Sequence, residues 1–430
     1  MTIDVTPKVS AYAAPDRDYR VPYLPVGSKV GAAELEAVSQ VLRSGATLSG
    51  GAWRARFEED FRSYVGTPYA LSTTSGTVSL ELAIHLLDLR PGDEVVVTPQ
   101  TYQATLQPLF QYPQVRVRFC DVSPDTMNMD PVRLEELVNH RTRAVILVHY
   151  GGLPADMQAI TAIARAHDAV VIEDSAHAIG SSYQGRRPGS LGDIGCFSFH
   201  SSKNITTLGE GGMLTLHNEE WAQRIERLRG NETDAHFVPH LHRFGDSAEA
   251  LPGALYPGNA YTHDCAALLR HGTNATLSEA AAAVGSVQLA ALPELVARRR
   301  LIASRLREVL ENHADCVELP AEPAGAEQSH HLFTFFVRGP RKIDRDRLVN
   351  ELRERGVQMI LRYFPLHLTP EWRARSHYYG ECPVAERLWF HEQVNLPCHP
   401  GLSDKETELL CDLLDDALRT VRRDRKQKPC

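Results

Sequence analysis

The stretch between Tyr69 and Asp174 constrains the fold more than any other part of the chain, because short apolar runs alternate there with segments of helical periodicity. Runs such as Glu94–Val97 and Arg143–His149 are apolar at nearly every position rather than at every second one. Strands that are buried on both faces have this pattern, and they occur in parallel sheets covered by helices on both sides. The sequence therefore predicts an α/β fold with a mostly parallel sheet.

Further elements continue the alternation on both sides of these runs. The other strands and helices expected in this part are Val115–Phe119, Ala169–Asp174, Tyr102–Phe110, Pro131–Asn139 and Asp156–His167. Ligands of such sheets bind at the carboxyl ends of the strands. This rule singles out Tyr102, His149, Asp174 and His177, because each of them closes or follows a predicted strand.

Composition excludes several classes of protein. The chain has 430 residues, of which 43% are hydrophobic, so it is long enough for a large core and a second, smaller domain. A formal charge of −8 argues against a nucleic-acid partner. The first thirty residues contain no apolar signal-peptide core, and we expect no run that reaches the roughly eighteen apolar residues of a membrane span. The eight cysteines show no metal-ligand spacing, so we expect reduced thiols, no metal site and a cytoplasmic protein.

Three parts are expected along the chain. Residues 1–24 contain Pro7, Pro15 and Pro22, with Pro25 directly after them, and predict an extended arm that lies across another surface. Residues 25–295 are expected to form the large domain, and residues 296–430 a smaller α+β domain. Within them, Asn274–Leu289 predicts a helix that a second long helix follows, and Gln358–Arg362 predicts a strand. The stretch 217–272 is poorly periodic, and we expect it to contribute to a substrate pocket.

Lys203 lies in a polar loop between two apolar runs, Cys196–Phe199 and Met213–Leu216. Only seven of the 46 basic residues are lysines, so arginine is the usual choice where charge alone is needed. An amine in a desolvated pocket can lose its charge, and a neutral amine is the nucleophile that forms a Schiff base with an aldehyde. The alternative is a solvated loop lysine without a chemical role.

The turn Ser75-Gly76-Thr77 and the strand-end residue Asp174 each have a functional and a structural interpretation. The turn Ser75-Gly76-Thr77 leads from a strand directly into a helix, where free N–H groups and the helix dipole favour an anion such as phosphate. The same residue types are ordinary helix caps. Asp174 follows the apolar run Ala169–Ile172 and Glu173, so it is expected to be buried beside a partner. That partner is either a protonated ring nitrogen of an electron-sink cofactor or a group of the chain itself, in a helix cap or an internal ion pair.

The order of these signals is more specific than any one of them. Along the chain it reads Ser75-Gly76-Thr77, Tyr102, Asp174 with His177, Ser198, Lys203 and Gly209-Glu-Gly-Gly212. In this order the chain resembles the DegT/DnrJ/StrS family of sugar aminotransferases from about Val30 to the last helix. The resemblance implies the pyridoxal 5′-phosphate (PLP)-dependent transferase fold of type I, with a mostly parallel seven-stranded sheet between helices and a smaller α+β C-terminal domain.

The resemblance also implies roles for individual residues. Lys203 would hold the cofactor covalently and later carry the proton between Cα and C4′, and Asp174 would pair with the pyridine nitrogen. The remaining implied cofactor contacts are Gly76, Thr77 and Ser198 at the phosphate, Tyr102 stacked on the ring, and His177 beside the ring or its 3-hydroxyl. Asn274 would reach the phosphate from the neighbouring subunit, which implies a homodimer with shared sites.

The substrate residues are less clearly implied. Arg362 stands where many members have histidine, and its guanidinium could take the carboxylate of the amino donor with two hydrogen bonds. The alternative is a strand-end arginine that pairs with a surface carboxylate. His367 lies in the same loop and is a candidate substrate contact. Ala275 and Thr276 replace residues that the family often has aromatic and basic, and the 231–272 segment is longer than usual.

The predicted function is a ping-pong aminotransferase. An amino acid, glutamate, glutamine or alanine, would give its amine to PLP, and a keto-sugar or keto-cyclitol would accept it, in the biosynthesis of an aminosugar or aminocyclitol antibiotic. One alternative is a PLP-dependent sugar dehydratase of the same fold, against which Lys203 argues because that relative has histidine in its place. The other is a regulator that binds PLP without catalysis.

Overall fold

The computed structural model describes residues 18–230, 234–238, 265–270 and 272–423. Its centre is a seven-stranded sheet with the strand order β1-β8-β7-β5-β4-β2-β3. Neighbouring strands are parallel except around β8, which runs antiparallel to both β1 and β7. These strands are β1 Tyr69–Thr73, β2 Glu94–Val97, β3 Arg116–Phe119, β4 Thr142–Val148, β5 Val170–Asp174, β7 Ile194–Ser198 and β8 Gly212–Leu216. The predicted fold class is confirmed.

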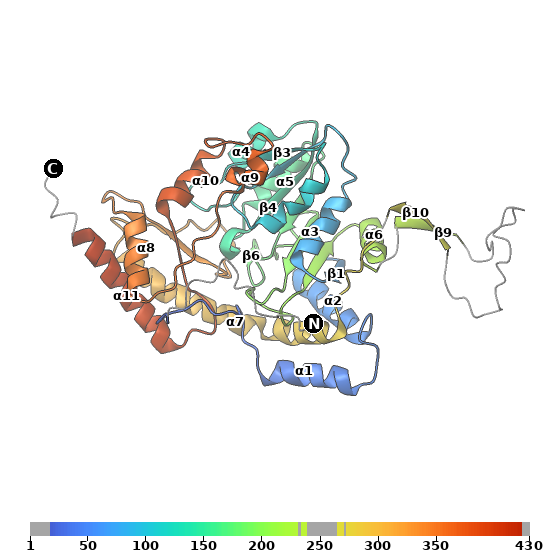
Figure 1. Cartoon of the computed structure of the whole chain (residues 1–430), viewed down its shortest axis with the longest axis horizontal. Coiled ribbons are helices and arrows are strands. Elements are labelled where there is room, and N and C mark those ends of the chain that lie inside the picture. Colours follow the sequence, from blue (N-terminus) through green and yellow to red (C-terminus); the bar gives the residue numbers. More distant parts are fainter. Residues whose placement is uncertain (1–17, 231–233, 239–264, 271, 424–430) are drawn as a thin grey trace, which may run out of the picture.

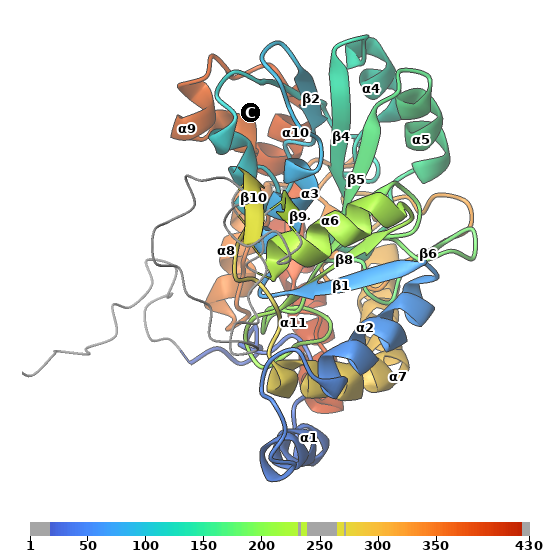
Figure 2. The same ribbon diagram turned by 90° about the vertical axis from the view of Figure 1, so that its right-hand side faces the viewer.

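Alternate residues of the central strands enter two different cores, as the two-residue period of a strand requires. On β2, Val95 and Val97 pack with the helix α3 (Gly76–His85), whereas Val96 packs with α4 (Pro131–Leu137) and α5 (Met157–Arg165). Figure 2 shows α4 and α5 beside β4 and β5, with α3 on the other side. Both faces of the sheet are therefore buried, which explains why its strands read as continuous apolar runs.

The helices begin where the sequence provides caps. The side chains of Ser75, Asp156 and Asn218 accept hydrogen bonds from the first turns of α3, α5 and α6, respectively. The helices of the first half and its flanks are α1 Ala32–Arg43, α2 Ala52–Val65, α6 Glu219–Arg229 and α7 Glu279–Glu311, with short 3₁₀ turns at Gln103–Thr105, Gln107–Gln111 and Tyr150–Gly152. Figure 1 shows α7 running beneath the sheet with α1 below it.

The smaller C-terminal part has a core of its own, to which α7 contributes its second half. Its antiparallel pair is β12 with β13, and α8 and α11 cover it (Figure 1). The elements of this part are β12 Phe333–Phe336, α8 Arg345–Glu354, α9 Pro370–Arg373, α10 Pro383–Arg387, a π-helical turn Leu388–Glu392, β13 Gln393–Leu396 and α11 Asp404–Arg423, with a 3₁₀ turn at Leu366–Leu368. Apolar residues of 366–388 pack into the core of the large sheet instead. The domain boundary at 295/296, which lies within α7, stays a prediction.

Three predicted elements differ from the structure. Tyr102–Phe110 forms two 3₁₀ turns instead of one helix, because Pro108 lacks the N–H that would continue a helical ladder. The helix predicted from Asn274 begins at Glu279, where Ser278 caps it, and continues through Pro293 as one helix. Gln358–Arg362 is not a strand, and Gln358 donates its N–H to Val21 O instead (3.0 Å).

The stretch 217–272, which the sequence predicts to be poorly periodic, contains α6 and two paired strands. These strands are β9 (Asp234–Val238) and β10 (Cys265–Arg270), which pair antiparallel with each other. Two shorter paired strands elsewhere are β6 (Ser182–Tyr183) and β11 (Ala326–Glu327). Part of a substrate pocket was expected in 217–272, and residues 231–233, 239–264 and 271 of this stretch lie outside the described residues.

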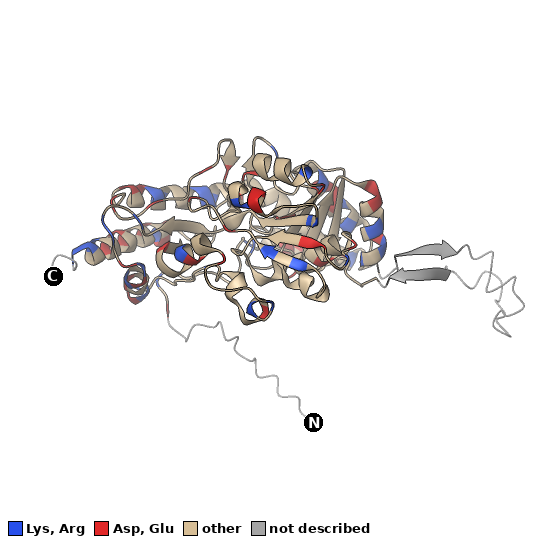
Figure 3. Ribbon diagram, turned by 90° about the horizontal axis from the view of Figure 1, so that it is seen from above, with Lys and Arg blue, Asp and Glu red and all other residues tan. Residues whose placement is uncertain are grey.

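The surface charges and the helix α7 relate to two expectations from the sequence, namely no nucleic-acid partner and no membrane span. Lys and Arg residues lie interspersed with Asp and Glu over the helices in Figure 3. By length and composition, α7 is long and apolar enough to cross a membrane, with an 18-residue window of mean hydropathy 1.5, which the sequence reading did not anticipate. Half of that window is buried, and α7 packs on α1, α2 and α11. In this fold α7 is a core helix.

Candidate active site

The loop that carries Lys203 connects β7 to β8 and is held by its own backbone. Phe199 donates its N–H to Gly211 O (2.8 Å), and Lys203 donates its N–H to His200 O (2.9 Å). The next residue, Asn204, is buried, and its amide donates to Ile179 O (2.9 Å). The base of Lys203 is thus fixed at the carboxyl end of β7, with its side chain half-buried.

Asp174 closes β5, the neighbour of β7, and only 5% of its surface is exposed. One carboxylate oxygen accepts a hydrogen bond from the Thr105 hydroxyl (2.6 Å), and the other accepts the Ala176 N–H (3.1 Å). Burial raises the pKa of Asp174, while these hydrogen bonds and the charge of Lys203 act in the opposite direction. The Thr105 contact was not predicted, because it depends on the 3₁₀ turn that replaces the expected helix.

The amine of Lys203 experiences the charges of Asp174 and Arg362. Burial lowers the pKa of Lys203 from its ordinary 10.5 to about 8, and the Arg362 guanidinium adds to this decrease, whereas the Asp174 carboxylate raises the pKa. At neutral pH an appreciable fraction of the Lys203 amine is therefore uncharged, whereas the amine of an exposed lysine is almost entirely charged. Of the two interpretations of Lys203, the structure favours a chemically active amine.

His177 lies in a stack of three rings. Its ring is 4.3 Å from that of His331 and 5.7 Å from that of Tyr363, measured between centroids, and its Nε2 is 3.1 Å from the Tyr363 hydroxyl. Burial lowers the pKa of His177 well below its ordinary value, so the ring is neutral. Its Nδ1 is buried and has no hydrogen-bond partner among the described residues.

His331 was not singled out in the sequence, although it is as buried as its neighbours. Its Nδ1 donates to the side-chain oxygen of Asn204 (3.0 Å), which links the ring stack to the residue that follows Lys203. The only sequence signal was a pair of histidines, His330 and His331, directly before a strand. That signal does not indicate which distant ring the pair would contact.

The first turn of α3 lies on the end of β7. A Cβ built on Gly76 would be 2.7 Å from the Cβ of Ser198, so only glycine allows this approach. Ser75 caps the helix by accepting the Val78 N–H (3.2 Å), while the first N–H groups of a helix have no intrahelical partners. Gly76, Thr77 and Ser198 therefore meet at one point that suits an anion.

Tyr102 and Arg362 are both neighbours of Tyr363. The Tyr102 ring, which is 52% exposed, is 5.9 Å from the Tyr363 ring. The peptide bond between Arg362 and Tyr363 is cis. The guanidinium of Arg362 lies over the ring of Tyr23, 5.8 Å from its centroid. In the part of the chain that the structure describes, Arg362 forms no salt bridge, contrary to the surface ion pair that was its alternative interpretation.

Two candidates are not brought to this cluster within one chain. His367 is fully buried, its Nε2 lies 2.8 Å from a carboxylate oxygen of Glu386, and its ring packs against Phe119. Its prediction as a substrate contact gains no support from this geometry. Asn274 is exposed, and its neighbour Ala275 accepts the Thr74 N–H (3.0 Å), which places this segment beside the start of α3.

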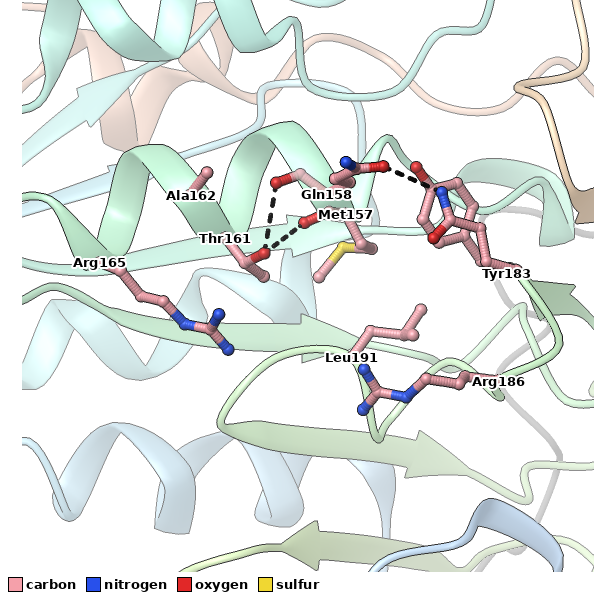
Figure 4. Close-up of a pocket in the computed structure, with 9 residues that line it drawn as sticks. Met157, Gln158, Thr161, Ala162, Arg165, Tyr183, Arg186 and Leu191 are labelled. Atoms are coloured by element: carbon pink, nitrogen blue, oxygen red, sulfur yellow. Dashed lines mark hydrogen bonds between the residues drawn. The ribbon is translucent and has the colours of Figure 1, made fainter.

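A separate hollow of about 360 Å³ lies between α5 and the β6 region, away from Lys203. Figure 4 shows Met157 and Leu191 in its middle, with Arg165 and Arg186 at its edge. The Tyr183 hydroxyl in its wall is satisfied by Asp156 (2.9 Å). The active-site residues thus do not contribute to this hollow.

The site therefore combines an amine of lowered pKa, a buried carboxylate and an anion seat at the carboxyl edge of a parallel sheet, which is the equipment of an enzyme that condenses an amine with a cofactor aldehyde. Residues 28–415 match the model of the DegT/DnrJ/EryC1/StrS aminotransferase family. The chain belongs to this family.

Individual relatives agree with this assignment. The chain is 32% identical over 395 residues to the dTDP-4-dehydro-2,3,6-trideoxy-D-glucose 4-aminotransferase of Saccharopolyspora spinosa, covering 90% of this chain and 95% of the relative. The crystal structure of the aminotransferase TlmJ from Streptoalloteichus hindustanus superposes with a TM-score of 0.78 at 32% identity, covering 93% and 99% of the two chains. The PLP form of Spr1654 from Streptococcus pneumoniae superposes with a TM-score of 0.79 at 25% identity, covering 94% and 100%.

Aminotransferases of this family are PLP-dependent, as the sequence resemblance implied. The residues of this chain fit the cofactor. The amine of Lys203 suits the aldehyde of PLP, and the Asp174 carboxylate suits its pyridine nitrogen. The unpartnered Nδ1 of His177 suits the 3-hydroxyl, and the close packing at Gly76 suits the phosphate.

The lowered pKa of Lys203 has a measurable consequence in the cofactor-free protein. We expect acylation of Lys203 by acetic anhydride, followed by peptide mass spectrometry, to show a half-maximal rate near pH 8. Exposed Lys405, labelled in the same experiment, serves as the control. Because the Asp174 carboxylate raises the pKa of Lys203, Asp174→Asn should move the midpoint of Lys203 to lower pH. A midpoint equal to that of Lys405 would contradict the electrostatics described here.

Proposed function

We propose that the protein transfers an amino group from an amino acid to the carbonyl of a keto-sugar or keto-cyclitol. The observation that carries this proposal is Lys203, whose half-buried amine of lowered pKa lies within the electrostatic reach of Asp174. The relative from Saccharopolyspora spinosa is named for a dTDP-linked keto-sugar, which supports a sugar acceptor. Glutamate, glutamine or alanine is the proposed donor, and an aminosugar or aminocyclitol antibiotic pathway in the cytoplasm is the proposed context.

Each part of the cofactor has a proposed holder. Gly76, Thr77 and Ser198 would hold the phosphate, and Tyr102 would cover one ring face. His177 would use its unpartnered Nδ1 beside the ring or its 3-hydroxyl. When bound, PLP supplies a carbonyl that takes up the amine and a ring that accepts the electrons released at the substrate carbon.

Asp174 and Lys203 would divide the proton chemistry. The Asp174 carboxylate, fixed by Thr105 and Ala176, would keep a proton on the ring nitrogen, because a buried negative charge favours a cation beside it. Lys203 would anchor the cofactor and then, as a free amine, move a proton at the substrate carbon. A pKa of about 8 suits both giving and taking that proton near neutral pH.

The proposal is tested on Lys203. Lys203→Ala should fold but lose turnover by several orders of magnitude, whereas Lys405→Ala should keep it. Borohydride reduction of the wild type should fix the cofactor on the peptide that contains Lys203, and the absorbance of the wild type should change when glutamate, glutamine or alanine is added. Label on Lys29 or Lys342 would contradict the site. A stable spectrum with every donor would instead indicate a cofactor-binding regulator.

Arg362 is the residue proposed to bind the carboxylate of the amino donor. Its guanidinium lies in the cluster without a carboxylate partner among the described residues, and a planar fork binds a carboxylate with two charge-assisted hydrogen bonds. An uncharged keto-sugar or keto-cyclitol has no such group at its reacting end.

Arg362→Lys keeps the positive charge but removes the planar pair of N–H donors. It therefore distinguishes an effect on the donor half-reaction from an effect on the acceptor half-reaction. We expect the KM for the amino donor to rise roughly ten- to a hundredfold, about 1.4 to 3 kcal/mol, with the acceptor half-reaction nearly unchanged. Single-turnover kinetics of each half-reaction measures this, and Arg43→Lys, an exposed arginine, is the matched control. Equal losses in both half-reactions would mean that Arg362 does not read the donor.

A homodimer is the proposed functional unit. Tyr102 and Leu208 are exposed although they lie near a site that must exclude water, and Asn274 is exposed as well. A second copy would cover them, and Asn274 would then reach the phosphate seat of its partner.

Mixing two inactive variants tests the shared site. If Asn274 acts on the partner, a Lys203→Ala chain exchanged with an Asn274→Asp chain should form heterodimers with one intact site each. Activity should rise well above that of either parent, measured after confirmed subunit exchange and compared with each variant mixed with itself. A mixture as inactive as its parents would place Asn274 in its own chain's site or outside it.

A further inference from the structure

Residues 20–28, called the strap below, form an extended segment that is fastened to the C-terminal part of the same chain. Val21 donates its N–H to Gly356 O (3.1 Å) and accepts the Gln358 N–H (3.0 Å). His399 Nε2 donates to Pro22 O (3.0 Å). The arm that the sequence places across another surface thus lies, in its described part, against its own chain.

The other end of the strap lies on the loop of Lys203. Gly27 donates its N–H to Ser201 O (2.8 Å), and a Cβ on Gly27 would be 2.1 Å from Ser202 O and 2.7 Å from Lys203 O. Arg299 of α7 donates to Gly27 O (2.5 Å). The strap therefore has one end fixed beside Arg362 and the other fixed on the loop that carries Lys203.

Tyr23 is the residue of the strap that faces Arg362. Its N–H donates to the Gln358 side chain (2.7 Å), and its ring lies 5.8 Å from the guanidinium carbon of Arg362. The backbone of Arg362 is fixed independently of Tyr23, because its N–H donates to Asn395 (2.9 Å) and its carbonyl accepts from Tyr150 and Gln393. What the Tyr23 ring can determine is the direction of the long, flexible Arg362 side chain.

We propose that Tyr23 is a positioning residue: its ring holds the Arg362 guanidinium over the site, so that the guanidinium receives the carboxylate of the amino donor. A guanidinium is attracted to the face of an aromatic ring, and this contact uses none of its N–H groups. The Tyr363 hydroxyl is a second neighbour of the Arg362 guanidinium, and the remaining N–H groups can bind a carboxylate. The inference rests on the proposed donor role of Arg362. The contact requires the ring face and not the hydroxyl, for which no hydrogen bond is seen in the described structure.

The test uses Tyr23→Leu, which removes the ring, and Tyr23→Phe, which keeps it. Tyr378→Leu, at a tyrosine that is 61% exposed, is the matched control. In cofactor-free protein, we expect the rate of Arg362 modification by phenylglyoxal, read by peptide mass spectrometry, to rise about two- to tenfold in Tyr23→Leu. It should stay at the wild-type rate in Tyr23→Phe and Tyr378→Leu.

Kinetics of the holoenzyme supplies the second measurement. In Tyr23→Leu the half-saturating donor concentration should rise about three- to tenfold, with the limiting rate and the acceptor half-reaction unchanged. In an Arg362→Leu background the same Tyr23→Leu change should have no further effect on the donor, because the two residues act through one interaction.

The outcomes separate this inference from the donor role of Arg362. If Arg362→Lys affects neither half-reaction, the donor role is wrong, and the phenylglyoxal rates alone decide whether Tyr23 holds Arg362. If Arg362→Lys weakens the donor but Tyr23→Leu changes neither the donor half-saturation nor the modification rate, the inference is overturned. Equal effects of Tyr23→Phe and Tyr23→Leu would overturn it as well, since Phe keeps the ring.

Discussion

The site depends on the burial of two opposite charges, the Asp174 carboxylate and the Lys203 amine, at the ends of neighbouring strands β5 and β7. Burial disfavours the charged form of both groups, which raises the pKa of Asp174 and lowers that of Lys203. Their mutual attraction opposes both shifts without cancelling either. Asp174 has two hydrogen-bond donors of its own, whereas no hydrogen bond to the Lys203 amine is recorded among the described residues. The asymmetry leaves the carboxylate fixed and the amine free for chemistry.

Much of this arrangement can be predicted from the sequence, because ligands of a parallel sheet bind at the carboxyl ends of its strands irrespective of the particular side chains. Asp174 was expected at the carboxyl edge for that reason, and the Lys203 loop because it lies between two apolar runs. Ser198 was implied only by the family resemblance, and Gly76 was singled out because its turn leads from a strand into a helix. Contacts made by irregular backbone were missed. Thr105 reaches Asp174 only because Pro108 divides the expected helix, and His331 meets His177 only after the C-terminal part folds back on the sheet. No local pattern encodes such contacts.

Arg299 shows how the irregular segments are held together. Its guanidinium is 1% exposed and donates to four backbone carbonyls, those of Gly27, His330, His331 and Cys398. Burial lowers its pKa to about 10, yet the group stays charged at neutral pH. A buried charge without a carboxylate partner is costly unless carbonyl dipoles surround it. Here they do, and three segments without regular secondary structure converge on one side chain.

Because these segments converge on Arg299, some residues around the Lys203 loop are buried and hydrogen-bonded, whereas others are exposed. Asn204, His331 and Arg299 connect the Lys203 loop, the ring stack and the strap through hydrogen bonds between buried groups. Tyr102 and Leu208, in contrast, are exposed. A displacement of the strap would therefore be felt at Arg299 and, through His331, at His177, because buried polar groups cannot give up partners without a cost of about 1 to 3 kcal/mol each. The side of Tyr102 and Leu208, which a second copy would cover in the proposed homodimer, carries no such penalty within one chain.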